Sequence, residues 1–217
     1  MDPIVELVPD ALIFDTDVRC TRDQLRALKA VGFRGGVRTV TASAAADQSD
    51  VTAAEVADFM AEGLGLMLYQ RPRNPGWMPT AELGEVDASV FVAKAERAGY
   101  LAGATTWDDI EGIGGTGAAT VAYANAKAAV LTAAKYGPGG YVGYEVPLTG
   151  YELRHSLVVP VYWRSASNVP DVADRGYAVV QIAENISVAG VLVDVSVARA
   201  DRLGGRPAWM RDRSAAA

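Results

Sequence analysis

The sequence predicts an α/β fold in which eight strands close into a single TIM-like barrel. Strand-like and helix-like segments alternate five times along the chain, and three further strand-like segments follow with little helix between them. No repeat, linker or change in composition divides the 217 residues. We therefore expect one barrel domain over residues 1–217, built as five βα units followed by three strands, (β/α)5β3, with a C-terminal tail from about residue 205.

The expected strands are short runs rich in Val, Leu, Ile and aromatic residues, bounded by polar or glycine-containing stretches. The last two are separated by about four residues, which is too short for a crossover helix. The eight strands are expected at residues 11–15, 33–40, 64–70, 100–111, 141–146, 158–166, 177–184 and 188–198.

Helices are expected where apolar residues recur at helical spacing behind a capping residue. Thr21 is a suitable N-cap for the first helix, and Thr52 with Glu55 indicates a capping box at the second. The basic tail from Arg202 is broken by glycine and proline, so we expect it to wrap the surface and fray at its terminal alanines. The expected helices cover residues 21–32, 52–63, 83–99, 118–137 and 149–157.

Composition argues against several classes of site. A net charge of −6 and a pI near 4.9 argue against a nucleic-acid partner, which requires a basic surface. Cys20 is the only cysteine, so the chain forms no internal disulfide and no cysteine metal cluster. His155 is the only histidine, which argues against a zinc site and, without a GxSxG elbow, against a serine triad. We expect neither a metal nor another cofactor.

The first ten residues, MDPIVELVPD, are acidic and lack the basic and apolar regions of a secretory signal. No apolar run reaches the roughly 18 residues needed to span a membrane. The best run, VAGVLVDVSVA, is interrupted by Asp194. We therefore expect a protein that is cytoplasmic when it is synthesised and that has no membrane partner.

Four acids stand at the ends of otherwise apolar strands. Asp109 and Glu111 lie two apart in TTWDDIEGI, so on a strand both side chains project from the same face. Asp15 ends the first strand and Asp194 is embedded in the last, where propensity and burial disfavour an acid. Because the first and last strands are neighbours in a closed barrel, we expect these four carboxyl groups to converge. Such a pocket raises the pKa of at least one of its carboxyl groups, as acid–base chemistry requires.

Other polar and aromatic residues near the same strand ends are candidates for contact with a substrate. The aromatic side chains offer flat apolar surfaces on which sugar rings pack, and the others offer hydrogen bonds. The glycine loop GIGGTG has no P-loop lysine, so we expect a flexible loop over the site and not a phosphate cradle. The substrate-binding candidates are Arg38, Tyr69, Gln70, Trp107, Tyr144, Tyr162, Trp163 and Gln181.

Each candidate also has a purely structural explanation. Asp109 and Glu111 are compatible with a solvated strand end, and Asp194 with a turn cap or an arginine pair. Asp15 and Asp17 precede a helix, whose dipole favours acids at that end. Tryptophans fill a core more often than they bind a sugar. The choice between these explanations depends on whether the acids meet in space.

The order of the acidic motifs resembles a known family. Asp109-Ile110-Glu111 after GATTW, Asp15 in LIFDTD and Asp194 in VLVDVS are similar to the acids of the family-25 lysozymes. The relatives of these lysozymes include the glycoside-hydrolase-like barrel domains of actinobacteria and their phages. In that superfamily the first strand ends in Asp, the fourth carries Asp-x-Glu, and the last carries Asp. The resemblance spans nearly the whole chain and implies a barrel whose final three strands lack regular helices.

The resemblance also implies roles for these residues. Glu111 would be the general acid that protonates the leaving glycosidic oxygen, with Asp109 as its partner carboxylate. Asp109 would either stabilise positive charge at the anomeric carbon or orient the acetamido group of the substrate. Asp15 and Asp194 would complete the acidic floor. The implied activity is that of a lysozyme-like glycosidase on bacterial cell-wall peptidoglycan or a related amino-sugar polymer, as a phage endolysin or a virion-associated hydrolase.

Two other functions fit the same residues. A non-catalytic barrel would bind cell-wall glycan or serve as a structural component of a phage virion, since a fold does not determine a function. A phosphodiesterase barrel would use the acids to hold a divalent cation, although two histidines usually assist at such a site.

Overall fold

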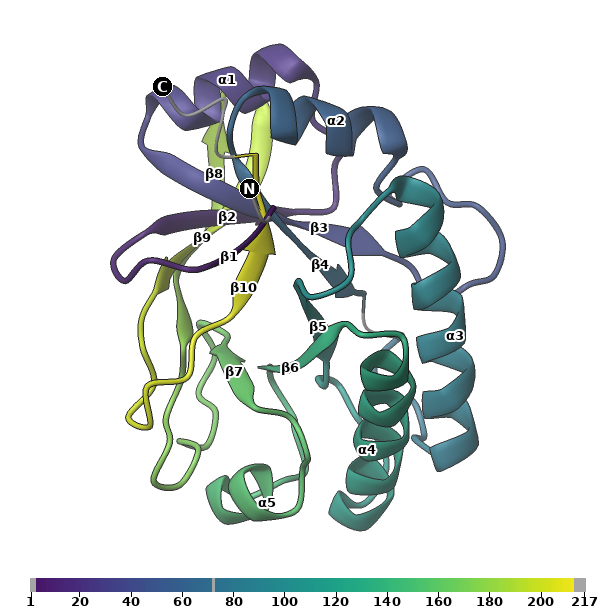
Figure 1. Ribbon diagram of the computed structural model, residues 1–217. Helices are drawn as coiled ribbons and strands as arrows, with labels where there is room; N and C mark the ends of the chain where they lie inside the picture. The colour runs from purple at the N-terminus through teal and green to yellow at the C-terminus, as the bar shows by residue number, and fades with distance from the viewer. Residues whose placement is uncertain (1–2, 72, 213–217) are drawn as a thin grey trace.

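The computed structural model describes residues 3–71 and 73–212, and a closed barrel of eight strands lies at its centre (Figure 1). The strands follow the order β4-β3-β2-β9-β8-β7-β6-β5, and pairing of β5 with β4 closes the ring. Neighbours are parallel except at β9, which runs antiparallel to both β2 and β8. The predicted α/β barrel is confirmed. Its strands are β2 (Leu12–Thr16), β3 (Phe33–Val40), β4 (Gly65–Gln70), β5 (Thr105–Asp109), β6 (Gly137–Val142), β7 (Val161–Arg164), β8 (Val179–Val188) and β9 (Val191–Ala198).

Helices pack on the outside of the barrel and follow one another from α1 at the top of Figure 1 to α5 at the bottom. Each begins after a threonine whose side chain accepts a hydrogen bond from a backbone N–H of the first turn, which satisfies a donor that the helix leaves unpaired. The helices are α1 (Arg22–Ala30), α2 (Ala53–Ala61), α3 (Ala81–Ala98), α4 (Gly117–Ala133) and α5 (Gly150–His155).

The capping box predicted at the start of α2 is wrong, because the Glu55 side chain turns beneath the helix. Its Oε1 atom accepts hydrogen bonds from Arg38 Nε at 2.7 Å and from the Cys20 backbone N–H at 2.9 Å. Arg38 also donates to the carbonyl oxygens of Thr16 and Ser49. Both charged side chains are buried, so this pair fastens β3 to α2, and removal of either partner would leave an uncompensated charge in the interior.

The C-terminal tail does not simply wrap the surface as expected, because part of it forms a strand. β10 (Ala208–Met210) pairs antiparallel with β1 (Ile4–Glu6), and Met210 pairs with Leu66 near the start of β4. A three-residue strand has too short a pattern to be recognised in a Gly/Pro-broken sequence. The expected fraying falls on residues 213–217, which lie outside the described residues.

Trp209 of β10 closes the end of the barrel at which β3 and β4 begin. It is 1% exposed, and its ring lies against the backbones of Gly35 and Gly65. A Cβ atom at these glycines would come within 2.5 Å and 2.1 Å of the indole, so neither position accommodates a side chain. The two glycines therefore make room for the plug that seals the amino-terminal end of the barrel.

Two strands lie elsewhere along the chain than predicted. β6 begins at Gly137 instead of residue 141, which leaves Tyr144 in the loop that follows. GPGG reads as a turn, but Gly139 faces the Trp107 ring, and a Cβ there would approach it to 2.7 Å. β5 begins at Thr105 instead of residue 100, because the residues before it form a turn.

Alternation along each strand sorts side chains between the barrel interior and the layer beneath the helices. On β5, Trp107 belongs to the interior cluster, whereas Asp108 faces α4 and pairs with Lys127. Two further apolar clusters fill the space between the strands and the helices. The interior cluster consists of Leu7, Ala11, Ile13, Val37, Met67, Trp107, Val161, Trp163, Ala178, Val179, Ala198 and Trp209.

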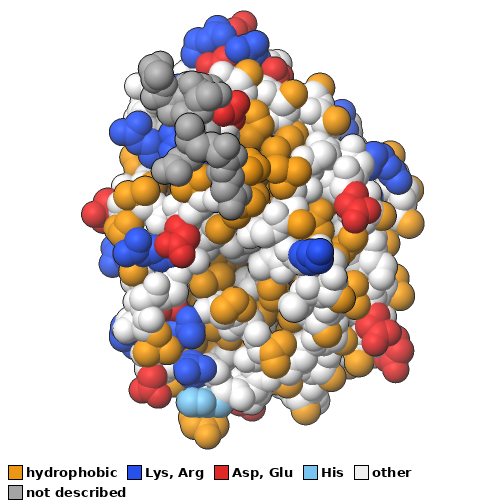
Figure 2. Space-filling model, viewed as in Figure 1, with side chains coloured by type: hydrophobic (Ala, Val, Ile, Leu, Met, Phe, Trp, Pro, Cys, Tyr) orange, Lys and Arg blue, Asp and Glu red, His pale blue; other side chains and the backbone are white. Residues whose placement is uncertain are grey.

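The face shown in Figure 2 carries apolar side chains near its centre and charges of both signs around its edge. It therefore presents no broad area of a single charge. Within the part of the chain that the structure describes, no helix has the length and apolar character needed to cross a bilayer.

Replacing Trp209 with Ala should lower the free energy of unfolding by about 3–5 kcal/mol, because it removes a buried indole and opens a cavity in a closed barrel end. Urea denaturation followed by circular dichroism measures the change. The matched control is Leu203→Ala in the same C-terminal stretch, where the side chain is 53% exposed and the expected change is within about 0.5 kcal/mol. Equal effects of the two substitutions would contradict the assignment of Trp209 as the plug.

Candidate active site

The four acids singled out in the sequence meet at one mouth of the barrel. They line a pocket of about 240 Å³. A second hollow of about 210 Å³ shares Asp15, Asp17, Tyr69 and Asp194 with it, so the two lie side by side. The residues around the first hollow, which we call the acid pocket, are Asp15, Asp17, Tyr69, Arg71, Asp109, Glu111, Tyr141, Trp163 and Asp194.

Strand register positions the acids. Asp15 lies near the carboxyl end of β2 and pairs directly with Asp194 of the antiparallel strand β9. Asp109 is the last residue of β5 and pairs with Tyr141 of β6. Glu111 follows two residues later, in the loop beyond β5. Segments from the beginning, middle and end of the chain thus supply one site, as barrel closure predicts.

The Glu111 side chain fits against a backbone that has no side chain to oppose it. A Cβ atom at Gly143 would lie 2.0 Å from Glu111 Oε2, so only glycine leaves room for this carboxyl group. The Tyr144 backbone hydrogen-bonds the carboxylate. On the other side, Trp77 Nε1 donates to the Glu111 carbonyl oxygen at 3.0 Å. The loops after β4 and β6 therefore hold Glu111 from both sides.

The glycine loop beyond Glu111 is packed and does not match the flexible cover that was expected. Gly76 N–H donates to the Gly112 carbonyl oxygen at 2.7 Å, and Gly114 N–H donates to that of Trp77 at 2.9 Å. A Cβ at Gly114 would lie 2.5 Å from the Gly76 carbonyl oxygen. The glycines permit this close approach of two backbones, which steadies the loop that carries Glu111.

Burial raises the pKa of three carboxyl groups in the acid pocket. It places the pKa of Asp15 well above the ordinary value, with repulsion from Asp194 as the next cause. It does the same for the pKa of Asp109, with repulsion from Glu111 as the next cause. Burial also raises the pKa of Glu111 to about 7, against the opposing effect of the Tyr144 hydrogen bond. The pocket therefore retains protons at a pH where ordinary carboxyl groups are ionised.

Some of these carboxyl oxygens have partners and others do not. Asp194 accepts hydrogen bonds at 2.7 Å from both Gln181 Nε2 and the Asn185 backbone N–H. By contrast, Asp15 Oδ2 and Asp109 Oδ1 are buried without a hydrogen-bond partner among the described residues. A buried oxygen without a partner is costly when it is charged, so both atoms favour the protonated form of their carboxyl groups.

Aromatic side chains form the walls and floor of the acid pocket. Tyr69 donates its hydroxyl hydrogen to Asp17 and lines the wall. Trp163 also lines it, with its Nε1 donating to Ser196 Oγ at 3.0 Å. Trp107 lies 5.6 Å from Trp163 between ring centroids and is 1% exposed, so it supports the pocket from below and does not contact a ligand.

The remaining candidates divide by the face of their strand. Gln181 points into the barrel, where its Oε1 accepts from Tyr141 at 3.1 Å, and it orients Asp194. Tyr144 is 37% exposed, and its hydroxyl lies close to Gly112 in the loop beyond Glu111. Both lie near the acids without lining the acid pocket itself.

Three sequence candidates for substrate contact face away from the acid pocket. Arg38 is held by Glu55 under α2, as described above. Gln70 donates to the Asp87 carbonyl oxygen in α3 at 3.0 Å, and Tyr162 donates to the Leu153 carbonyl oxygen in α5. The expectation that these three side chains bind substrate was wrong, because even-numbered positions of these strands point outward to the helices and not into the barrel.

Sequence reasoning missed Arg71, Tyr141 and Asp17 as pocket residues. Tyr141 was hidden by the misplaced start of β6. Asp17 and Arg71 lie just beyond the ends of their strands, where the alternation of a strand no longer indicates which way a side chain points. Residues two apart on a strand share a face, so Tyr141 follows Gly139 into the barrel interior. Placing Gly139 there would have identified Tyr141 as a pocket residue.

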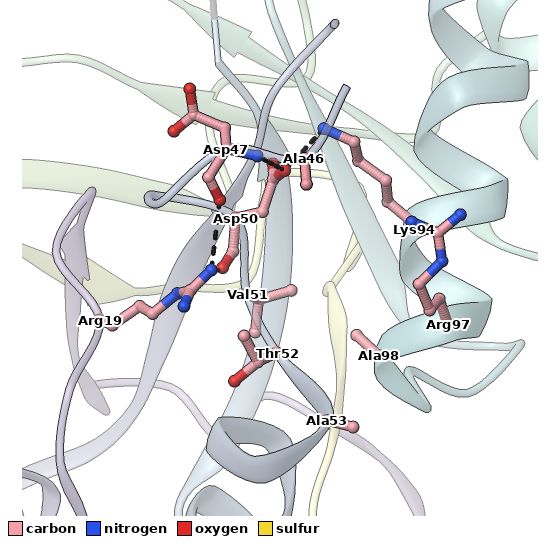
Figure 3. A pocket seen from close by; sticks show the side chains of 10 residues that line it. All are labelled: Arg19, Ala46, Asp47, Asp50, Val51, Thr52, Ala53, Lys94, Arg97 and Ala98. Carbon is pink, nitrogen blue, oxygen red and sulfur yellow. Dashed lines mark hydrogen bonds and ion pairs between the residues drawn. The ribbon is translucent and has the colours of Figure 1, made fainter. Parts of the chain in front are cut away.

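Two further findings concern ligand sites. No group of three or more His, Cys, Asp or Glu side chains is arranged to hold a metal ion within residues 3–71 and 73–212. A separate pocket of about 260 Å³ lies between α3 and the loop before α2 (Figure 3). There Lys94 pairs with Asp50 at 2.7 Å and Arg19 donates to the Asp50 carbonyl oxygen at 3.0 Å, so these charges hold the loop in place.

A model of the Rv2525c-like, glycoside hydrolase-like domain family matches residues 26–198, most of the chain. The chain belongs to this family. The match includes Asp109, Glu111 and Asp194, and it confirms the resemblance to glycoside-hydrolase-like barrel domains that the acids suggested. No curated protein gives a significant sequence match to this Rv2525c-like domain.

Solved structures share the fold of this Rv2525c-like domain. Rv2525c, a Tat-secreted protein of Mycobacterium tuberculosis in complex with L-tartrate, is 16% identical with a TM-score of 0.67 over 91% of this chain and 98% of its own. An uncharacterised B. stearothermophilus protein is 18% identical with a TM-score of 0.67 over 87% and 96%. The modular autolysin LytC of Streptococcus pneumoniae, with a synthetic peptidoglycan ligand, is 14% identical with a TM-score of 0.59 over 86% and 46%. At these identities the likeness establishes the fold.

Replacing Glu111 with Gln should stabilise the Rv2525c-like domain at pH 8 and not at pH 4. The folded-state pKa of about 7 lies above the unfolded value of 4.5, so the stabilising contribution of the protonated group is present below pH 4.5 and is lost as the pH rises through 7. Because the group is partly solvated, we expect a gain of about 1 kcal/mol at pH 8. Urea denaturation at both pH values measures it, and an equal change at both would contradict the shift.

Proposed function

We propose that this protein is a glycoside hydrolase that cleaves peptidoglycan or a related amino-sugar polymer. The observation that carries the proposal is Glu111, a carboxyl group with a pKa of about 7 in a pocket that it shares with four other acids. Glycosidic cleavage needs one carboxyl group that keeps its proton near neutral pH, and a second group facing the sugar. The acid pocket supplies both.

In the proposed reaction Glu111 donates its proton to the glycosidic oxygen as the bond between that oxygen and the anomeric carbon breaks. Water then adds to the anomeric carbon, and a carboxyl group of the pocket takes up the proton that the water releases. The backbones of Gly143 and Tyr144 fix the Glu111 carboxyl, which favours one direction of proton transfer.

Asp109 has two candidate roles, and its surroundings favour one of them. Burial and the neighbouring Glu111 raise its pKa, so Asp109 keeps its proton more readily than an ordinary aspartate. Its buried Oδ1 atom has no partner among the described residues. Both properties suit a hydrogen bond to the acetamido group of the substrate better than a permanently charged partner for the anomeric carbon. Asp15 and Asp194 bound the pocket on the opposite side.

Two further observations support an amino-sugar polymer as the substrate. Tyr69 gives the acid pocket a partly buried aromatic wall, and the partly buried Trp77 and the exposed Tyr144 flank the loop of Glu111. Aromatic surfaces beside carboxyl groups suit the apolar faces and polar edges of sugar rings. LytC, which shares the fold, forms a complex with a synthetic peptidoglycan ligand. We place the action of this protein at the bacterial cell wall.

Glu111→Gln should abolish the clearing of purified bacterial cell walls in a turbidity assay, with a loss of at least about a hundredfold, because glutamine has no acidic proton to donate. Gly143→Ala should also reduce clearing strongly, since its Cβ would displace the Glu111 carboxyl. The matched controls are Glu96→Gln on the exposed side of α3 and Gly137→Ala, where the nearest atoms lie 3.6 Å from the added Cβ.

Undiminished clearing by Glu111→Gln would contradict the proposed function. Wild-type protein that sediments with cell walls but never clears them would instead support the non-catalytic alternative, a glycan-binding barrel or a structural component of a phage virion. Cleavage that disappears on addition of a chelator would support a cation-dependent phosphodiesterase.

A further inference from the structure

The acid pocket has a cation at its edge. Five of its lining residues are acidic, and Arg71 is the basic one among the described residues that line it. The chain as a whole carries a net charge of −6. An anionic polymer would therefore be repelled from this mouth unless a local positive charge received it.

The guanidinium of Arg71 is available for a ligand. Arg71 directly follows β4, and its backbone N–H donates to the Val40 carbonyl oxygen at 3.0 Å, which anchors the residue. Its side chain is half exposed, and its Nε lies 3.6 Å from Asp17 Oδ2, beyond a strong hydrogen bond. The other carboxyl oxygen of Asp17, Oδ1, accepts hydrogen bonds from Thr39, at 2.5 Å, and from Tyr69. Asp17 thus holds Arg71 through a long ion pair, and half of the Arg71 side chain stays exposed to a ligand.

Arg71 also borders a larger open hollow of about 530 Å³, which it shares with Arg73, Asn74 and Trp77. Arg73 is engaged by Asp87, to which it donates two hydrogen bonds, so its charge is neutralised. Trp77 is fixed by the hydrogen bond from its Nε1 to the Glu111 carbonyl oxygen. The hollow therefore joins an aromatic surface next to Glu111 with the half-exposed guanidinium of Arg71, whose ion pair with Asp17 is long.

We propose that Arg71 is a specificity-determining residue that binds a carboxylate substituent on the sugar next to the cleaved bond. This inference rests on the proposed function and narrows its substrate to an amino-sugar polymer that carries carboxylate groups, in preference to a neutral one. The planar guanidinium presents paired N–H donors that match both oxygens of a carboxylate. Its place between the acid pocket and the hollow of Trp77 directs that substituent away from the five acids.

Two oligosaccharides test the assignment by isothermal titration calorimetry, with Glu111→Gln protein so that neither is turned over. One is a muramic-acid-containing tetrasaccharide, which bears lactyl carboxylates, and the other is the neutral chitin tetrasaccharide. Adding Arg71→Gln should weaken binding of the acidic probe by about fivefold to tenfold relative to the neutral one. Arg71→Lys should recover part of the preference, and raising the salt concentration should reduce it.

The matched control is Arg34→Gln, which removes the same charge at an exposed position near the start of β3, toward the opposite end of the barrel. It should leave the ratio of the two affinities unchanged. Equal losses for both probes after Arg71→Gln, or binding of neither probe to the Glu111→Gln protein, would overturn the role of Arg71. Wild-type protein that prefers the acidic probe through Arg71 but clears no walls would refute hydrolysis and leave this recognition intact.

Discussion

Barrel closure pairs Asp15 of β2 with Asp194 of β9, and the rest of the site is built around this unfavourable contact. Like charges that face each other across adjacent strands destabilise a sheet, and burial of a carboxyl group adds a further cost. Asp109 at the end of β5 and Glu111 in the loop that follows lie in the same pocket and add to that repulsion. The surrounding barrel must offset the cost, and it does so with interior tryptophans and glycines that allow close packing.

The two faces of β5 show how one strand serves both the scaffold and the site. Asp108 points outward and forms a buried ion pair with Lys127 of α4, so its charge is matched. Asp109, the next residue, points inward and makes no ion pair within the part of the chain that the structure describes, and repulsion from Glu111 adds to burial in raising its pKa. The difference between the two aspartates is therefore one of partners and not of burial, since both are buried. Unmatched acids on the inner face are what distinguish the candidate active site from the structural ion pairs around it.

The sequence was sufficient to predict the barrel and the convergence of four acids, because closure makes the first and last strands neighbours regardless of loop detail. It did not predict which side chains at the strand ends face inward. Arg38, Gln70 and Tyr162 lie at the predicted ends but on the outer face, and one misplaced strand start concealed Tyr141. The face to which a side chain points follows from the register of its strand. The register of β6 depends on glycines whose sequence, GPGG, is typical of a turn. Contacts between distant segments, such as Arg38 with Glu55, leave no local pattern.

The proposed hydrolysis depends on Glu111 holding its proton near neutral pH within a shared acidic pocket. Carbon-13 NMR of the Asp and Glu side-chain carboxyl groups, recorded from pH 3 to pH 9, tests this most directly. We predict one glutamate resonance with a midpoint near pH 7 that is absent from the spectrum of Glu111→Gln. Titration of every glutamate carboxyl in the ordinary range around pH 4 would contradict the account.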